Sequence, residues 1–281
     1  MKSKVDNKVD NNGISESNNY KYSMPREQGV EPSCIVVTYS VSPNLEEAIL
    51  TLQKNGASVH YIIDTDGEQY QYHNDLHDQA FFAGRSYWKG QESVNGFGIG
   101  IMFINDARNV AEKYIDPINT IEGFKEQFKD FTQPQIDQAK FLLQDISKRY
   151  PEIDMKHDLV SLGEVAERHV APGPKFFWKE LAEMGFGMFR TSTEQDTKNI
   201  LIVKDQEGGL VTDVQSELKK YGYNIAESGI CDESTQTWFS KFNTRYVPNQ
   251  SPPNEWSVGS KNSLELLLGG VSEHLLDGDI M

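Results

Sequence analysis

The chain has 281 residues and a formal net charge of −15 at pH 7, with 37% hydrophobic and 11% aromatic residues. This length and composition predict one medium domain and a smaller second one, rather than a disordered chain. An acidic chain without a basic block is poorly suited to bind nucleic acid or an anionic membrane, and no apolar run approaches the roughly 18 residues of a membrane span.

Residues 1–32 are rich in Asn, Ser, Lys and Asp and show no hydrophobic periodicity, so they are predicted to form a disordered tail. The basic residues near Met1 are not followed by an apolar stretch. A secretory signal is therefore not expected, and a cytoplasmic location is favoured, with membrane association only through a larger complex. Cys34 and Cys231 lie in no metal-binding or redox spacing and are predicted to be free, buried thiols; a disulfide between them is the alternative.

Short strands and helices alternate over residues 33–190, which predicts an α/β domain with a central mixed sheet flanked by helices. The β-branched run at 34–40 and the apolar run at 96–105 are typical of buried central strands. Between them, residues 59–73 predict two strands joined by an Asp-Gly hairpin turn.

Two helices are predicted to accompany this sheet. The first runs from Leu45 to a stop at Gly56. The second opens with Thr132 and Gln135 in capping-box spacing and ends before Pro151, and its apolar side is expected to pack on the sheet.

A polar linker at 191–209 is predicted to precede a second, smaller module at 210–247. Two apolar stripes at helical spacing predict that this module is a small helical bundle. Residues 248–281 are predicted to form a C-terminal tail. Within this tail, LELLLGG (264–270) is an apolar patch that either packs on its own chain or binds a partner.

Six segments follow one another in an order that resembles one known family. They are VHYIIDTDGEQYQYH (59–73), FFAGRSYWKG (81–90), VNGFGIGIMFIN (94–105), FTQPQ (131–135), KHD (156–158) and APGPKFFW (171–178). Over roughly residues 33–184 the chain resembles the zinc-dependent N-acetylmuramoyl-L-alanine amidases of type 2. The resemblance implies the α/β fold of that family.

Residues 210–246 resemble the peptidoglycan-binding domain that is often joined to such amidases. The pattern is carried by Val214, Leu218, Gly222, Tyr223, Gly229, Asp232, Thr235, Trp238 and Phe242. An unrelated three-helix unit is the alternative.

The family resemblance implies a zinc site made by a histidine of the first strand, a second histidine and a carboxylate just before the Pro-Gly-Pro turn. It places Thr38, His157 and Ala171 at these positions, although His157 and Ala171 stand four residues further apart than in the family pattern. A hydroxyl is a poor substitute for imidazole, and a methyl group has no donor atom. Because a lone histidine does not hold zinc, no metal and no cofactor are expected.

Three further positions depart from the family pattern. Met102 stands where the family has a glutamate base, Phe82 replaces a histidine, and His169 corresponds roughly to a lysine that polarises the carbonyl. All six positions are interpreted as vestiges of a site, and an apolar, closed cleft is expected. The candidates for a rebuilt metal site, the less favoured alternative, are His60, His73, His77, His169, Asp75, Asp78 and Asp158.

These losses predict a catalytically inactive amidase fold that serves as a cytoplasmic scaffold or adaptor in a bacterial multiprotein complex, such as a secretion or envelope assembly. The expected partners are other proteins, including basic surfaces, whereas peptidoglycan fragments are not favoured. Two alternatives stay open: a non-hydrolytic binder of peptidoglycan or muropeptides, and an active amidase with an atypical site.

Overall fold

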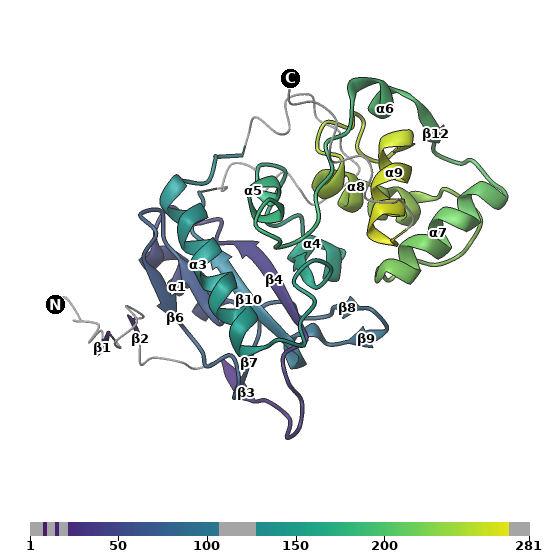
Figure 1. Ribbon diagram of the computed structural model, residues 1–281. Helices are drawn as coiled ribbons and strands as arrows, with labels where there is room; N and C mark the ends of the chain where they lie inside the picture. The colour runs from purple at the N-terminus through teal and green to yellow at the C-terminus, as the bar shows by residue number, and fades with distance from the viewer. Residues whose placement is uncertain (1–7, 10–14, 17–21, 107–127, 270–281) are drawn as a thin grey trace. The chain divides into compact units, whose positions relative to one another are not determined.

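The computed structural model describes residues 8–9, 15–16, 22–106 and 128–269 (Figure 1). The chain divides into two compact units, residues 1–188 and 189–281. The charged stretch at 107–127 and the end of the predicted C-terminal tail at 270–281 lie outside the described residues.

Within the described residues, unit 1 is built on a seven-stranded sheet with the strand order β1-β2-β6-β5-β10-β4-β11. These strands are β1 (Lys8–Val9), β2 (Ser15–Glu16), β4 (Cys34–Tyr39), β5 (Tyr61–Ile63), β6 (Gln69–Gln71), β10 (Gly98–Phe103) and β11 (Leu159–Ser161). β4, β5, β10 and β11 run parallel, and β6 returns antiparallel to β5. β4 and β10 are buried at every residue, as expected for strands inside a parallel sheet. The predicted mixed α/β fold is confirmed.

The hairpin predicted at Asp66-Gly67 joins β5 to β6. Gly67 has a φ of +85°, and a Cβ at this position would lie 2.8 Å from the carbonyl oxygen of Pro134. Glycine is required here because the backbone is left-handed and the next helix begins directly against the turn.

The two main helices of unit 1, α1 (Leu45–Lys54) and α3 (Gln133–Arg149), match the two predicted ones. The side chain of Asn44 caps α1. The capping box between Thr132 and Gln135 opens α3, as predicted. α3 lies across the sheet (Figure 1), and its apolar residues Ala139, Leu142, Leu143 and Ile146 are buried.

Shorter elements complete the description of unit 1. They are β3 (Ser23–Pro25), β7 (Asp78–Ala80), β8 (Tyr87–Trp88), β9 (Gln91–Glu92), η1 (Val94–Gly96), α4 (Leu162–Val165) and α5 (Trp178–Ala182). β3 pairs antiparallel with β7. Residues 23–25, near the end of the predicted tail (1–32), therefore belong to the folded unit.

Unit 2 is a helical bundle with a short strand pair. Its elements are α6 (Glu194–Lys198), β12 (Ile200–Ile202), α7 (Gly209–Tyr221), α8 (Glu233–Tyr246), β13 (Trp256–Ser257) and α9 (Val258–Leu267). α6 and β12 occupy the segment predicted as a linker, 191–209. β12 pairs antiparallel with β13, which lies beyond the predicted end of the module at 247.

The core of unit 2 extends into the segment predicted as a C-terminal tail. The ring of Trp256 lies 4.8 Å from that of Phe239 and 5.0 Å from that of Phe242, centroid to centroid. The apolar stretch LELLLGG contributes the end of α9, where Leu264 and Leu267 are buried. Of the two alternatives for this stretch, packing on its own chain is the one that the structure shows.

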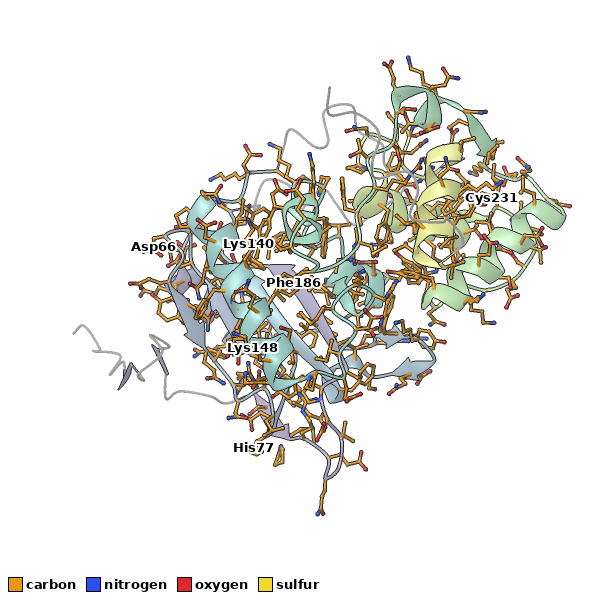
Figure 2. All side chains as sticks on the ribbon, in the orientation of Figure 1. Asp66, His77, Lys140, Lys148, Phe186 and Cys231 are labelled. Carbon is orange, nitrogen blue, oxygen red and sulfur yellow. The ribbon has the colours of Figure 1, made fainter. Side chains whose placement is uncertain are left out.

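Both cysteines are free and buried, as predicted; Cys231 lies in unit 2 (Figure 2). Burial raises the pKa of Cys34 and raises the pKa of Cys231 to about 11, so both thiols stay protonated at neutral pH. None of the helices in the described part of the chain is long and apolar enough to cross a bilayer.

Candidate functional site

The strands β4, β10 and β11 run parallel, so their carboxyl ends meet at one edge of the sheet, called here the carboxyl edge. Thr38 of β4 is the register partner of Met102 of β10. On the other side of β4, Ser161 pairs with Val37, so that Leu162, the next residue, follows at the level of Thr38. In open α/β sheets, ligands bind outside the carboxyl ends of the strands.

The Pro-Gly-Pro turn is fixed against this edge. The carbonyl of Ala171 accepts a hydrogen bond from the backbone N–H of Gly163 at 3.0 Å, which places Ala171 next to the start of α4. Gly173 has a φ of +85°, and a Cβ there would lie 2.6 Å from the ring of Phe128. The turn therefore holds Ala171 at the carboxyl edge, beside Leu162.

Four residues meet at the carboxyl edge: Thr38, Met102, Leu162 and Ala171. All four are buried, with exposed fractions of 4%, 7%, 5% and 8%. They offer one hydroxyl, one thioether and two hydrocarbon side chains, whereas zinc sites in proteins use imidazole, thiolate and carboxylate donors. The side chains at these four positions do not fit the zinc ion that the family pattern implies, so no catalytic step is derived through it.

His157 is not brought into this group. It lies two residues before β11, whose first residue, Leu159, pairs with Ile35 near the start of β4. Continued backwards, this register places His157 at the level of Ser33, five residues before Thr38. At about 3.3 Å per residue, five residues span roughly 16 Å along the strand. The Nδ1 of His157 instead lies 2.7 Å from a carboxylate oxygen of Asp154.

Leu162 is the position that the sequence interpretation missed. The signal was the spacing, since His157 and Ala171 stand four residues too far apart for the family pattern. Restoring the family spacing moves this position from His157 to residue 161, and the register with β4 moves it one residue further, to Leu162.

Phe82 and His169 lie in different surroundings. Phe82 packs against β10, where a Cβ at Gly100 would lie 2.6 Å from its ring. Its side chain therefore covers the middle of the sheet. His169 belongs to the same loop as Ala171, and its carbonyl oxygen lies 3.0 Å from the Cβ position of Gly163. Of these two sequence candidates, only His169 is near the carboxyl edge.

The residues considered for a rebuilt metal site do not form one. The Nδ1 of His60 accepts from the backbone N–H of Gly100 at 2.9 Å, so its Nε2 donates to the carbonyl of Asp78 at 3.2 Å. Burial lowers the pKa of His60 to about 4. In the part of the chain that the structure describes, no group of three His, Cys, Asp or Glu residues is placed to hold a metal ion.

Two ion pairs flank the carboxyl edge. Asp106, which follows β10, lies 3.0 Å from Lys129, and Lys175 of the Pro-Gly-Pro loop lies 3.2 Å from Asp130. The Lys129 and Asp106 side chains are 62% and 20% exposed, and those of Lys175 and Asp130 are 22% and 85% exposed. Each pair has one largely exposed partner, so solvent weakens both interactions.

Comparisons with known proteins support the mixed α/β fold described above. A family model described as N-acetylmuramoyl-L-alanine amidase matches residues 28–174. A Rickettsia conorii protein whose name assigns it to the N-acetylmuramoyl-L-alanine amidases is 45% identical over 271 residues, which cover 93% of this chain and 94% of that protein. The N-acetylmuramoyl-L-alanine amidase AmiD of Escherichia coli is 26% identical over 189 residues, 62% of each chain.

A solved structure of Escherichia coli AmiD superposes with a TM-score of 0.66 and 22% identity, and the match covers 94% of this chain and 98% of that one. That structure is a complex of AmiD with the substrate anhydro-N-acetylmuramic acid-L-Ala-D-γ-Glu-L-Lys. The match shows that the two proteins share a fold.

These comparisons contradict the function expected from the sequence. The relatives are named as amidases, and AmiD has been solved with a substrate. Nothing in them indicates a scaffold, an adaptor or a component of a secretion system. The expectation of a non-enzyme is therefore wrong, and the alternative of a non-hydrolytic binder has no support either.

Proposed function

The chain belongs to the N-acetylmuramoyl-L-alanine amidase family, and on that premise we propose that it cleaves the amide bond between N-acetylmuramic acid and L-alanine in peptidoglycan fragments. The observation that carries this proposal is the 45% identity to the Rickettsia conorii relative over 93% of the chain. Identity at this level spans both units, so the proposal concerns the whole chain.

The carboxyl edge is the proposed site for the fragment. Stem peptides that contain D-γ-Glu, as in the AmiD substrate, carry carboxylates. Among the described residues, Lys129 and Lys175 are cations that flank this edge, and they form ion pairs with Asp106 and Asp130. We assign to these two lysines the recognition of the peptide carboxylates, which form charge-assisted hydrogen bonds with ammonium groups.

The finer character of the site is also part of the proposal. The zinc-ligand set implied by the family resemblance is not kept at Thr38 and Ala171, and Leu162 adds no donor atom. No hydrolytic step is therefore assigned to these side chains. The family resemblance places the vestigial second histidine at His157, whereas the register of β11 with β4 favours Leu162.

Unit 2 is proposed to be the peptidoglycan-binding-like module that the sequence pattern implies. The five apolar positions of the pattern are buried in its core: Val214, Leu218, Tyr223, Trp238 and Phe242. Asp232 begins α8 by accepting from the backbone N–H of Thr235 at 2.8 Å. Cosedimentation of the full chain with purified sacculi tests this assignment, and a chain that stays in the supernatant would contradict it.

The test of the main proposal uses the purified full chain and the AmiD substrate anhydro-N-acetylmuramic acid-L-Ala-D-γ-Glu-L-Lys. Mass spectrometry is expected to detect the free tripeptide and the anhydro sugar, with and without added zinc. AmiD serves as the positive control in the same buffer. Intact substrate in the presence of this chain, under conditions in which AmiD cleaves it, overturns the proposal.

A paired variant tests the site. Lys175→Ala is expected to raise KM for this substrate, because a carboxylate contact is lost, while Lys179→Ala changes an exposed lysine on α5 and is expected to leave KM unchanged. Equal KM values for the two variants would remove the carboxyl edge from the proposal.

A further inference from the structure

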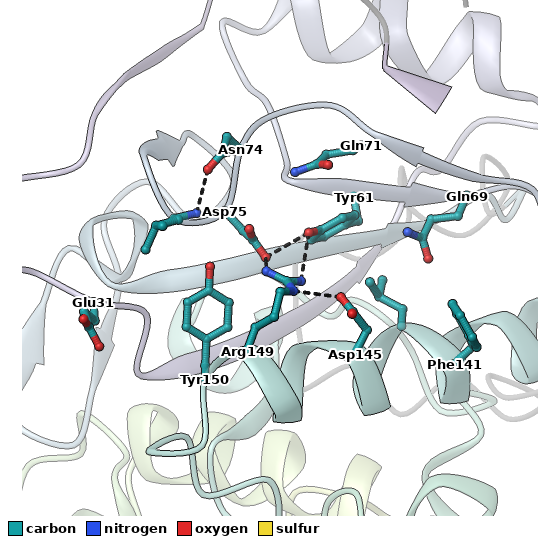
Figure 3. Close-up of a pocket in the computed structure, with 12 residues that line it drawn as sticks. Glu31, Tyr61, Gln69, Gln71, Asn74, Asp75, Phe141, Asp145, Arg149 and Tyr150 are labelled. Atoms are coloured by element: carbon teal, nitrogen blue, oxygen red, sulfur yellow. Dashed lines mark hydrogen bonds and ion pairs between the residues drawn. The ribbon is translucent and has the colours of Figure 1, made fainter. Parts of the chain in front are cut away.

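Unit 1 has a recess that is lined by none of the four residues of the carboxyl edge. It is a cavity of about 650 Å³ between α3 and the segment that runs from β6 to Leu76 (Figure 3). This volume lies in the range of small-molecule sites, about 300–1,000 Å³. The cavity is therefore large enough for a ligand of the size of a disaccharide.

The floor of the cavity is a hydrogen-bond network. The Asp75 carboxylate accepts from the hydroxyl of Tyr61 at 2.8 Å and from Nη1 of Arg149 at 2.6 Å. Nη2 of Arg149 donates to the Tyr61 oxygen at 3.1 Å, and its Nε donates to Asp145 at 2.8 Å. Asp75 and Tyr61 are nearly inaccessible, with exposed fractions of 3% and 2%. Such a floor is already organised before a ligand binds, which lowers the entropy cost of binding.

The walls of the cavity differ in character. One wall carries the side-chain amides of Gln69, Gln71 and Asn74, which present both donors and acceptors. The other wall is α3, where Phe141 lines the cavity with 58% of its surface exposed. An aromatic face beside planar amide and carboxylate groups matches a sugar ring, whose C–H face packs on the aromatic ring while its hydroxyls pair with the amides.

The charges that line the cavity indicate which part of a peptidoglycan fragment, the peptide or the glycan, can bind there. The lining contains Glu31, Asp75 and Asp145 against the single cation Arg149. An acidic stem peptide is repelled by this excess of carboxylates, whereas a neutral N-acetylated sugar is not. The cavity therefore suits the glycan part of the fragment.

We propose that this cavity is a binding site for a neutral N-acetylated saccharide, with Phe141 as the stacking platform and the Asp75–Arg149 floor as the hydrogen-bonding base. The inference rests on the proposed function, because it assumes that the protein meets peptidoglycan glycan.

The experiment measures binding of the N-acetylglucosamine disaccharide to the full chain by calorimetry. Phe141→Ala is compared with Leu50→Ala, which removes an equally exposed apolar side chain from α1. Loss of aromatic packing is expected to weaken the affinity about three- to tenfold in the first variant, and the second is expected to bind like the wild type.

Three results would overturn the proposal: no binding of the disaccharide, equal affinities of the two variants, or binding of a lysine-rich peptide in place of the sugar. Cleavage of the anhydro-muramoyl tripeptide, which has no further sugar, is expected to be unchanged in Phe141→Ala. Failure of the saccharide site and failure of the amidase proposal are therefore separate results.

Discussion

Thr38 of β4 and Met102 of β10 stand opposite each other in the parallel ladder at the carboxyl edge. Neither side chain is a strong ligand for zinc, and the two positions beside them, Leu162 and Ala171, carry only hydrocarbon. The edge nevertheless keeps the geometry in which four chain segments converge. Donor atoms placed at these positions are expected to meet.

The first prediction is that a metal site can be restored. The triple variant Thr38→His, Leu162→His, Ala171→Asp is expected to bind one zinc ion per chain, because it places two imidazoles and a carboxylate at one edge. Metal analysis after dialysis measures the bound zinc. The wild-type chain is expected to retain none at this edge.

The control for this variant is Thr38→His with Ala171→Asp, which leaves Leu162 and His157 unchanged. If His157 were the second ligand, this double variant would bind zinc as well as the triple variant. We expect it not to, because His157 lies at the opposite end of β11.

The second prediction concerns the Pro-Gly-Pro turn. Gly173→Ala is expected to destabilise the protein by about 2–3 kcal/mol, through a left-handed backbone and a clash with Phe128. Gly185→Ala has the same φ of +85° with nothing within 4 Å of its Cβ position, so it is expected to cost about 1 kcal/mol. Urea unfolding of both variants measures the difference. Equal losses would mean that Phe128 does not constrain the turn.

The third prediction is a dependence of stability on pH. The folded pKa of His60, about 4, lies below its ordinary value of 6.5. Between these values the unfolded chain binds the proton and the folded chain does not, so stability falls as the pH decreases from 6.5 to 4. This one group accounts for up to about 3 kcal/mol.

The measurement for His60 is chemical unfolding at pH 7.5 and pH 4.5. The loss of stability at the lower pH is expected to be smaller in His60→Gln than in the wild type. His77→Gln, which changes an exposed histidine, is expected to keep the wild-type loss. A His60→Gln chain with the full wild-type loss would contradict the assignment.

The fourth prediction concerns the floor of the cavity. Arg149→Met leaves the buried Asp75 carboxylate without its cation and is expected to destabilise the protein by about 1–2 kcal/mol, a value reduced by the partial exposure of the guanidinium. Lys148→Met, at the neighbouring exposed position, is expected to change stability by less than about 0.5 kcal/mol. Thermal unfolding compares the two, and similar effects would indicate that the Asp75–Arg149 pair contributes nothing.

Local signals in the sequence were enough to predict much of unit 1. The Asp-Gly hairpin and the Thr132–Gln135 capping box depend on residues close together in the chain, and both are present. The boundaries of unit 2 were harder to predict. The pairing of β12 with β13 joins residues more than 50 positions apart, and no pattern within either segment predicts it.

In the candidate site, too, residues within local motifs were predicted and a residue placed by distant contacts was not. Thr38, Met102 and Ala171 were identified from motifs that lie within single segments. Leu162 was missed because its place depends on the register between β11 and β4, which the sequence does not display. The functional expectation was wrong for another reason: it rested on a few substituted positions, whereas the similarity to a relative named as an amidase extends over 93% of the chain.

The contacts of Trp256 with Phe239 and Phe242 determine where this chain can be shortened. A fragment that stops at residue 247, the boundary suggested by the pattern, would leave two aromatic rings bare to water and one strand without its neighbour. Such a fragment would be prone to aggregate, so a soluble version of the second unit has to retain β13 and also α9, whose Leu264 and Leu267 are buried.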